Sequence, residues 1–245
     1  MLIDQAWGEE HHLTVPGDEE ETITFCADHF LSVAEEAVLD HGAFFVALSG
    51  GSTPRRLFQK LTQDPYQKRL PWSHTHLFWS DERAAGPSDP ESNYHMAMEA
   101  GLKRMPIPPS QIHRMVAEVN IEENARNYEA MIQKTLTSRH FDLVMLGMGD
   151  DGHTASLFPG TEGLNIEDRL IIANFIPQKN CYRMTMTFRC INSASHIAIY
   201  VLGSAKQKML KEALTTSDRY PIQKVGTSLH KVLWIADKAA AALLF

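Results

Sequence analysis

The chain contains little cysteine and no long apolar segment. Cys26, Cys181 and Cys190 are its three cysteines among 245 residues, and no two of them form a Cys-x-x-Cys pair. An odd number without such a pair argues against a disulfide scaffold or a zinc ribbon and favours a reducing compartment. No apolar run approaches the roughly 18–20 residues of a membrane-spanning helix. We therefore expect a cytoplasmic protein with no membrane partner.

Basic residues are also scarce, since 23 Lys and Arg face 30 Asp and Glu and give a formal net charge of −7. A nucleic-acid partner is therefore not expected, because phosphate neutralisation requires an excess of clustered positive charge. Residues 1–21 are acidic and lack a basic region followed by an apolar one, so they do not resemble a signal peptide. The pair His11–His12 is interpreted as surface, not as a metal-binding tract.

Short apolar runs alternate with longer amphipathic stretches along the whole chain. The apolar runs have the length of strands: 44–48, 76–79, 141–146, 170–174, 196–202 and 232–235. The amphipathic stretches fit helices: 20–40, 54–61, 92–105, 122–137, 205–214 and 237–244. This alternation predicts one α/β domain over residues 1–245, a three-layer Rossmann-like fold with a mainly parallel sheet and helices on both faces. In such sheets, ligands bind beyond the carboxyl ends of the strands.

The first of these ends is glycine-rich and leads into a helix. Two glycines would let the backbone approach a ligand, and a helix start presents free N–H groups with a partial positive charge. The sequence matches neither a Walker A motif nor a nucleophile elbow, and Thr53 is the expected helix cap. A phosphate is therefore the expected ligand, and a tight turn without a ligand is the alternative. The segment is Ser49-Gly50-Gly51-Ser52-Thr53.

Ionisable residues follow two further predicted strands. Asp81-Glu82-Arg83 comes directly after the run at 76–79, where solvated side chains are the alternative to a site. Gly147, Gly149 and Gly152 satisfy a Gly-x-Gly-x-x-Gly dinucleotide pattern. However, Asp150 and Asp151 would place carboxylates where a pyrophosphate must lie, so we reject that interpretation.

The same segment contains His153, two residues after Asp151 and directly before Thr154. No further ligands at suitable spacing support a metal site with Asp150 and Asp151. We instead predict that Asp151 orients His153, because a neutral histidine held by a carboxylate is a natural general base near pH 7.

Two cations complete the candidate site. Arg183 lies where apolar and polar residues alternate, which predicts a strand. Lys206 falls in the first turn of a predicted helix, where its charge opposes the helix dipole unless an anion binds nearby. A solvated surface lysine is the alternative for Lys206.

Together these segments resemble the 6-phosphogluconolactonase family. The resemblance rests on residues 48–54, on 81–83 with 92–94, on 147–160, and on the segments around Arg183 and Lys206. The wider superfamily includes glucosamine-6-phosphate deaminases, which supply the alternative function. Those enzymes carry an acidic residue five positions after the histidine, where this chain has Phe158. A sugar-phosphate sensor is a third possibility, but the residues before Ala43 leave no room for a DNA-binding module.

The resemblance implies hydrolysis of 6-phospho-D-glucono-1,5-lactone in the pentose phosphate pathway, without a metal or an organic cofactor. His153, oriented by Asp151, would activate the attacking water, with Asp81 and Arg83 in the same catalytic site. Residues 50–53, Arg183 and Lys206 would bind the phosphate. The resemblance leaves open whether Arg83 contacts the oxyanion, the hydroxyls or the phosphate. A monomer or weak homo-oligomer is expected, with the lactone as its small-molecule partner.

Overall fold

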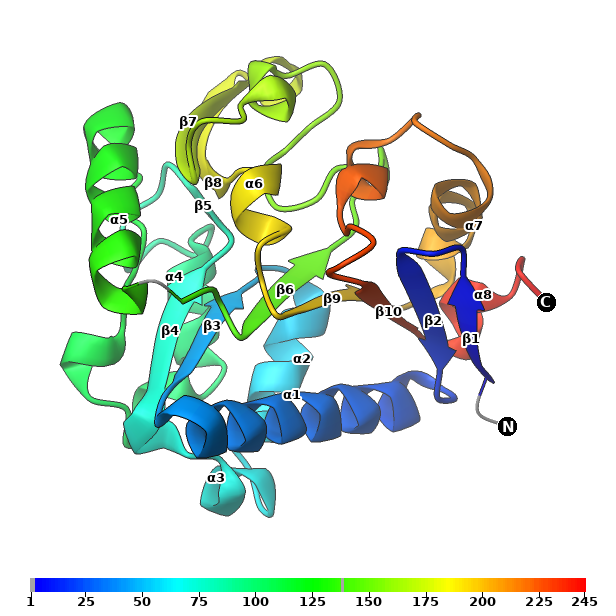
Figure 1. Ribbon diagram of the computed structural model, residues 1–245, viewed down its shortest axis with the longest axis horizontal. Helices are drawn as coiled ribbons and strands as arrows, with labels where there is room; N and C mark the ends of the chain where they lie inside the picture. Colours follow the sequence, from blue (N-terminus) through cyan, green and yellow to red (C-terminus); the bar gives the residue numbers. More distant parts are fainter. Residues whose placement is uncertain (1–2, 138) are drawn as a thin grey trace.

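The computed structural model describes residues 3–137 and 139–245, so Met1 and Leu2 of the acidic N-terminal segment lie outside it. The chain forms two sheets, one of seven strands and one of three (Figure 1). The larger sheet has the order β1-β2-β10-β9-β6-β3-β4. Its strands are β1 (Ile3–Trp7), β2 (His11–Val15), β3 (Phe44–Leu48), β4 (Thr75–Trp79), β6 (Leu143–Gly147), β9 (His196–Val201) and β10 (Val232–Ala236). The smaller, antiparallel sheet has the order β5-β8-β7 and comprises β5 (Asp81–Arg83), β7 (Ile171–Ile176) and β8 (Cys181–Met186).

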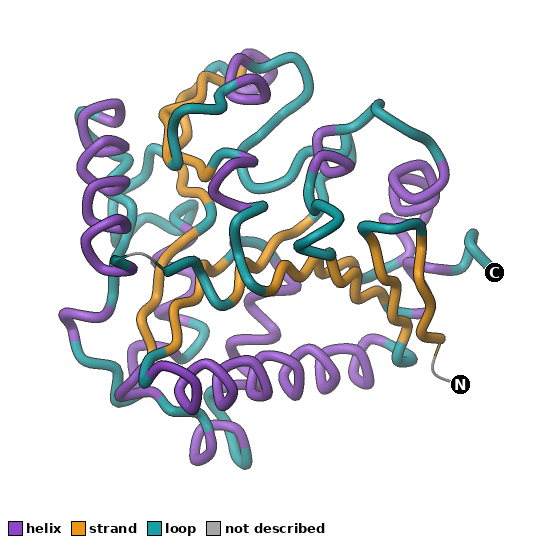
Figure 2. Tube along the Cα trace, viewed as in Figure 1, coloured by secondary structure: helices purple, strands orange, loops and turns teal. Residues whose placement is uncertain are grey.

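In Figure 2 the strands of the larger sheet extend across the molecule, and helices flank this sheet. They are α1 (Glu19–His41), α2 (Ser52–Leu61), α3 (Tyr66–Arg69), α4 (Asn93–Glu99), α5 (Ile121–Leu136), α6 (Phe188–Ile191), α7 (Gln207–Thr215) and α8 (Lys238–Ala241). In Figure 1, α1 runs beneath the larger sheet and α5 stands beside the smaller one. Within the described residues, no helix is long and apolar enough to cross a membrane. The predicted α/β class, with a mainly parallel sheet, is confirmed.

The inner strand β3, next to the edge strand β4, is buried along its whole length, as expected of a parallel strand covered on both faces. It pairs in parallel with β4 on one side and with β6 on the other. The chain continues from β3 to β4 on one side of β3, and β6 later pairs with β3 on its other side. The strand order therefore reverses between β3 and β6, which makes this boundary a topological switch point. Ligands bind at such points, beyond the carboxyl ends of the strands.

The smaller sheet is connected to this edge through Ser80. The backbone N–H of Ser80 donates to the carbonyl of Leu48 at 2.8 Å, and the N–H of Met186 donates to the carbonyl of Ser80 at 2.8 Å. One residue thus joins the end of β3 to the end of β8. The smaller sheet is thereby held beside the carboxyl end of β3.

Two parts of the fold differ from the sequence-based expectation. The run at 170–174 forms β7, which lies in the smaller antiparallel sheet and not among the parallel strands. The acidic N-terminal segment, for which the sequence predicts no strand, contains the β1–β2 hairpin, and β2 pairs with β10. His11 and His12 accordingly lie on β2, half-buried, with Trp234 Nε1 donating to His11 Nδ1 at 3.0 Å. The pairing of β2 with β10 joins segments far apart in the chain, so a short segment does not reveal it. β7 pairs with its neighbour β8, but the sheet that they form is completed by β5, which lies much earlier in the chain.

Helix ends also differ in detail. Ser92 caps α4, since its side chain accepts a hydrogen bond from the N–H of His95. The helix predicted over 92–105 ends at Glu99, and Gly101 follows with φ 140°. Helix α2 begins at Ser52 with Gly51 as its cap, so the prediction of Thr53 as the cap was wrong.

The carboxylate of Asp237 holds the loop before α7, and a substitution tests how much stability this contributes. Its carboxylate is 2% exposed and accepts the N–H of Gly203 at 3.0 Å and that of Ala240 at 2.7 Å. We expect Asp237→Ala to lower the free energy of unfolding by about 1–3 kcal/mol, because these N–H groups lose their acceptor. Urea denaturation measures this change. Asp168→Ala, at an exposed position, is the control and should stay within about 0.5 kcal/mol of the parent. Equal stability of both variants would contradict the assignment.

Candidate active site

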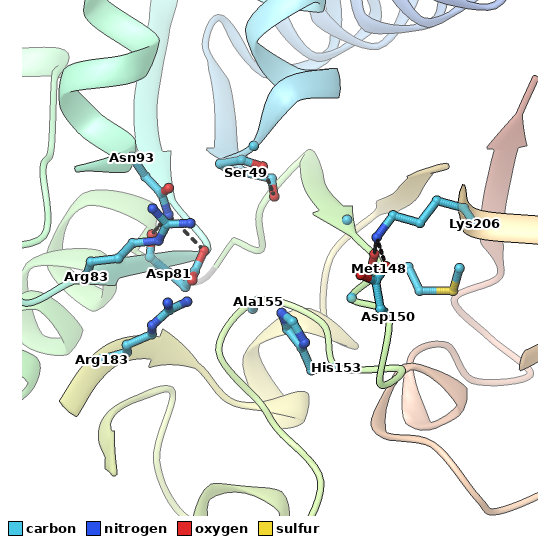
Figure 3. Close-up of a pocket in the computed structure, with 14 residues that line it drawn as sticks. Ser49, Asp81, Arg83, Asn93, Met148, Asp150, His153, Ala155, Arg183 and Lys206 are labelled. Atoms are coloured by element: carbon cyan, nitrogen blue, oxygen red, sulfur yellow. Dashed lines mark hydrogen bonds and ion pairs between the residues drawn. The ribbon is translucent and has the colours of Figure 1, made fainter. Parts of the chain in front are cut away.

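The loops that leave the carboxyl ends of the strands enclose a cavity of about 290 Å³ (Figure 3). It lies at the switch point between β3 and β6. Most of the residues singled out in the sequence line this one cavity: Ser49, Gly50, Gly51, Asp81, Arg83, His153, Arg183 and Lys206. The tertiary structure therefore brings together segments that are far apart in the chain.

The glycine-rich segment forms one wall. Gly51 has φ 105°, a conformation that favours glycine, and it caps α2 without any side-chain hydrogen bond. A Cβ on Gly50 would lie 1.9 Å from Oδ1 of Asn93, so only glycine fits there beside α4. The N-terminus of α2 thus keeps backbone N–H groups available beside the cavity. Ser52 and Thr53 lie in the first turn of α2 and do not line the cavity.

The three charged residues of the short strand β5 lie on its two opposite faces. Asp81 and Arg83 line the cavity, whereas Glu82 is 1% exposed and belongs to the interior, as strand alternation requires. The Glu82 carboxylate accepts the N–H groups of Asn93 and Tyr94 at 2.8 and 2.9 Å and thereby caps α4. Burial raises the pKa of Glu82, and these hydrogen bonds oppose the rise. Glu82 therefore fixes α4 to the strand that carries Asp81 and Arg83.

Asp81 is a nearly buried carboxylate at the cavity wall. It is 5% exposed and accepts hydrogen bonds from Ser156 Oγ at 2.6 Å and from Asn93 Nδ2 at 3.1 Å. Two neutral donors therefore satisfy part of its hydrogen-bonding capacity and fix its position. The same Ser156 Oγ accepts a long hydrogen bond of 3.4 Å from Arg183 Nη1.

Arg83 and Arg183 are cross-strand partners in the β5–β8 ladder. Like charges directly opposite one another destabilise a sheet. Arg83 Nη1 donates to the carbonyl of Glu91 at 2.6 Å, but the Nε groups of both arginines are buried without a partner. Two neighbouring cations with unused donors at a cavity wall fit an anionic ligand.

His153 and Asp151 form a hydrogen-bonded pair on the loop after β6. The Nδ1 of His153 lies 2.5 Å from Oδ1 of Asp151. With Asp151 ionised, Nδ1 carries the proton and donates, which leaves the Nε2 lone pair free. Asp151 itself does not line the cavity and stands behind the imidazole. A Cβ on Gly149 would lie 2.0 Å from Nδ1, so this loop needs glycine to pass close to the ring.

The pKa values of this pair reflect two opposing effects. Burial lowers the pKa of His153 below its usual value, although the hydrogen bond and charge of Asp151 act to raise it. Burial acts to raise the pKa of Asp151, but the hydrogen bond and charge of His153 outweigh it and the pKa lies below its usual value. At neutral pH the pair is therefore a neutral imidazole beside a carboxylate, the state of a general base.

Lys206 lies on the other side of His153 from the two arginines (Figure 3). It ends a 3₁₀ turn, Ser204–Lys206, that precedes α7. Its Nζ donates to the carbonyl of Met148 at 2.9 Å and to Oδ1 of Asp150 at 2.6 Å. Because the Asp150 side chain is largely exposed, this ion pair contributes little stability and its carboxylate is easily displaced by another anion.

Several residues at the site were not identified as site residues from the sequence. Asn93, Met148, Asp150 and Ala155 line the cavity, and Ser156 and Phe158 contact its side chains. Asp150 faces Lys206 while Asp151 faces His153, so the adjacent carboxylates serve different partners. Among residues 3–137 and 139–245, no group of three or more His, Cys, Asp or Glu side chains is placed to hold a metal ion. The signal that pointed to Asn93 was its place in residues 92–94, one of the segments on which the family resemblance rests.

The fold and the site define an α/β protein whose cavity, at the carboxyl edge of a parallel sheet, is lined by three cations and a histidine. A model of the glucosamine-6-phosphate isomerases/6-phosphogluconolactonase family matches residues 17–234. The chain belongs to this family.

Named relatives agree with this assignment. The chain is 38% identical to a 6-phosphogluconolactonase of Chlamydia muridarum over 230 residues, which are 92% of this chain and 87% of the relative. It is 36% identical to one of Aggregatibacter actinomycetemcomitans over 231 residues, 91% of this chain and 99% of the relative. The solved structure of a 6-phosphogluconolactonase from Trypanosoma cruzi superposes with a TM-score of 0.85 at 25% identity and covers 98% of both chains.

The His153–Asp151 pair can be tested without any substrate. Because Asp151 acts to raise the pKa of His153, we expect Asp151→Asn to lower it further. Histidine NMR titration measures the change, and His153→Gln identifies the signal. Asp150→Asn is the matched control, since its carboxylate contacts Lys206, and it should leave the His153 titration unchanged. A His153 pKa that rises or stays constant in Asp151→Asn would rule out the proposed interaction.

Proposed function

We propose that the protein is a 6-phosphogluconolactonase that hydrolyses 6-phospho-D-glucono-1,5-lactone to 6-phosphogluconate in the oxidative pentose phosphate pathway. The observation that carries this proposal is the neutral His153 held by Asp151 in a cavity lined by three cations, Arg83, Arg183 and Lys206. The names of the relatives support the same activity. The substrate is an anionic cyclic ester and suits such a cavity.

His153 would supply the proton transfers. Its Nε2 takes a proton from the water that attacks C1 of the lactone, and a tetrahedral oxyanion forms. The bond between C1 and the ring oxygen then breaks, and the imidazolium returns the proton to the leaving ring oxygen. Asp151 stabilises the imidazolium while it exists, because its carboxylate accepts the Nδ1 hydrogen bond throughout. Protons and atoms balance without any further reactant.

The cations on the two sides of His153 would receive the two charged parts of the substrate. We assign the phosphate to Lys206 and the N-terminus of α2 at the glycine-rich loop, where backbone N–H groups and a lysine face the same cavity. Arg83 and Arg183 would then stabilise the oxyanion or bind the sugar hydroxyls. For Arg183 this proposal differs from the sequence-based expectation, because Arg183 lies beside Arg83 and across the cavity from Lys206 (Figure 3).

The family description also names isomerases, so sugar-phosphate isomerisation or deamination is the alternative. We favour hydrolysis because the position five residues after the histidine holds Phe158, whose ring stacks on His153. A phenyl ring at that position cannot carry a proton. Lactone hydrolysis needs one activated water and no second proton carrier there.

The activity is tested with enzymatically made lactone. The protein should release 6-phosphogluconate well above the spontaneous rate and should not act on glucosamine 6-phosphate, the control substrate. His153→Ala should lower kcat about 10²–10⁴-fold, because it removes the general base. A folded His153→Ala variant with full activity would contradict the role of His153, and turnover of glucosamine 6-phosphate would favour the alternative.

Kinetics on two substrates distinguish the role of Lys206 from that of Arg183. Lys206→Ala should raise KM for the phosphorylated lactone roughly 10–100-fold, since it removes a charge-assisted hydrogen bond far from the reacting carbon. Activity on unphosphorylated gluconolactone should be unchanged. Arg183→Ala should lower kcat on both lactones.

Lys208→Ala is the matched control, because Lys208 is an exposed lysine on α7 outside the cavity. It should behave as the parent. An equal loss on both lactones for Lys206→Ala would refute its assignment to the phosphate.

A further inference from the structure

The ring of Phe158 lies flat against the imidazole of His153. Their centroids are 3.7 Å apart and their planes differ by 16°. Phe158 follows His153 by five residues, and the turn between them is closed by a bridge between Thr154 and Leu157. The side chain of Phe158 is 2% exposed, so it covers the histidine from the interior and does not act as a mobile lid.

Phe158 is held in place by contacts beyond the turn that joins it to His153. Arg183 on β8 lies over the Phe158 ring, with Cζ 5.5 Å from the centroid, and Nζ of Lys179 lies 5.8 Å from it. Cations at these distances are attracted to the ring. The carbonyl of Phe158 accepts a hydrogen bond from Thr161 Oγ1 at 2.8 Å. The ring is therefore a fixed surface to which the imidazole conforms.

The charges that face His153 come from three directions. Asp151 on its own loop and Asp81 on β5 favour the imidazolium, whereas Arg183 on β8 disfavours it. Burial has the largest influence and lowers the pKa of His153. The attraction of an imidazolium to the Phe158 ring is opposed by the positive charges of Arg183 and Lys179, which lie over the same ring. The main effect of Phe158 on the histidine is therefore to exclude water from one face.

We propose that Phe158 is a positioning residue for the reaction: its ring fixes the plane of the His153 imidazole and keeps one face dry, so that Nε2 meets the substrate as an uncharged base. Asp151 fixes the ring at Nδ1, and Phe158 fixes the remaining rotation about that hydrogen bond. The inference rests on the proposed role of His153 in lactone hydrolysis.

Phe158→Leu tests this proposal because it keeps an apolar side chain and removes the flat surface. We expect a higher His153 pKa by NMR titration, a shift of the acidic limb of kcat/KM to higher pH, and kcat lowered about tenfold. KM should stay within about twofold, since Phe158 does not line the cavity. Phe141→Leu is the matched control, because Phe141 is equally buried but packs against Phe78 in the core.

Phe141→Leu should lose stability without any change in the His153 titration or the pH profile. Phe158→Tyr keeps the ring and should keep the parent profile. If Phe158→Leu fails to fold, Phe158→Met provides the same comparison with a more flexible apolar side chain. An unchanged His153 titration and pH profile in the folded variant would overturn the proposal.

The NMR titration separates this inference from the proposed activity, because it needs no substrate. A protein without lactonase activity whose His153 pKa still rises in Phe158→Leu would refute the proposed function and retain the contact between the two rings. If the protein is active but its His153 titration is unchanged in Phe158→Leu, the positioning role alone is refuted.

Discussion

Parallel pairing of β3 with β4 on one side and β6 on the other is the constraint on which the site depends. The hydrogen-bonded register sets Leu48 opposite Trp79, and it aligns β6 with β9 so that Gly147 lies opposite Tyr200. The loops that follow these strands must therefore emerge at one edge of the sheet. Ser80 places the smaller sheet at the same edge, because its backbone hydrogen bonds join that sheet to the end of β3. Any change in that register would separate the glycine-rich loop, the arginine pair and His153 from one another.

The charge of the cavity is local and opposite to that of the chain. A net charge of −7 disfavours polyanions, yet three cations line one small cavity with Asp81 and Asp150. The cross-strand arginines repel each other, and the exposed Asp150 is a weakly held partner for Lys206. Both features are stabilised when an anion binds. The net charge of the whole chain is negative, while the cavity gathers three cations on its walls.

The basicity of His153 results from a balance of neighbouring groups. Burial keeps the imidazole uncharged, while the Asp151 hydrogen bond and the charge of Asp81 favour its protonation. Fully exposed, the ring would be protonated more readily but would rotate freely. Without Asp151, it would lose both orientation and stabilisation of the imidazolium. The stacked Phe158 contributes the apolar side of this balance, and Asp151 contributes the polar side.

The fold class, the strand ends and most residues that line the cavity can be predicted from the sequence. Alternating apolar and amphipathic segments follow from local periodicity, and glycines beside charged residues at strand ends mark a ligand edge. Other features are visible only in the folded structure. Residues 170–174 join a separate sheet, and β2 pairs with β10. Asn93 lines the cavity, and Phe158 stacks on His153. The tertiary structure also places Arg183 beside Arg83 and across from Lys206. Most of these outcomes depend on contacts between segments far apart in the chain, such as β2 with β10 and β5 with β8, and a local pattern carries no information about which distant partner a strand or side chain will meet.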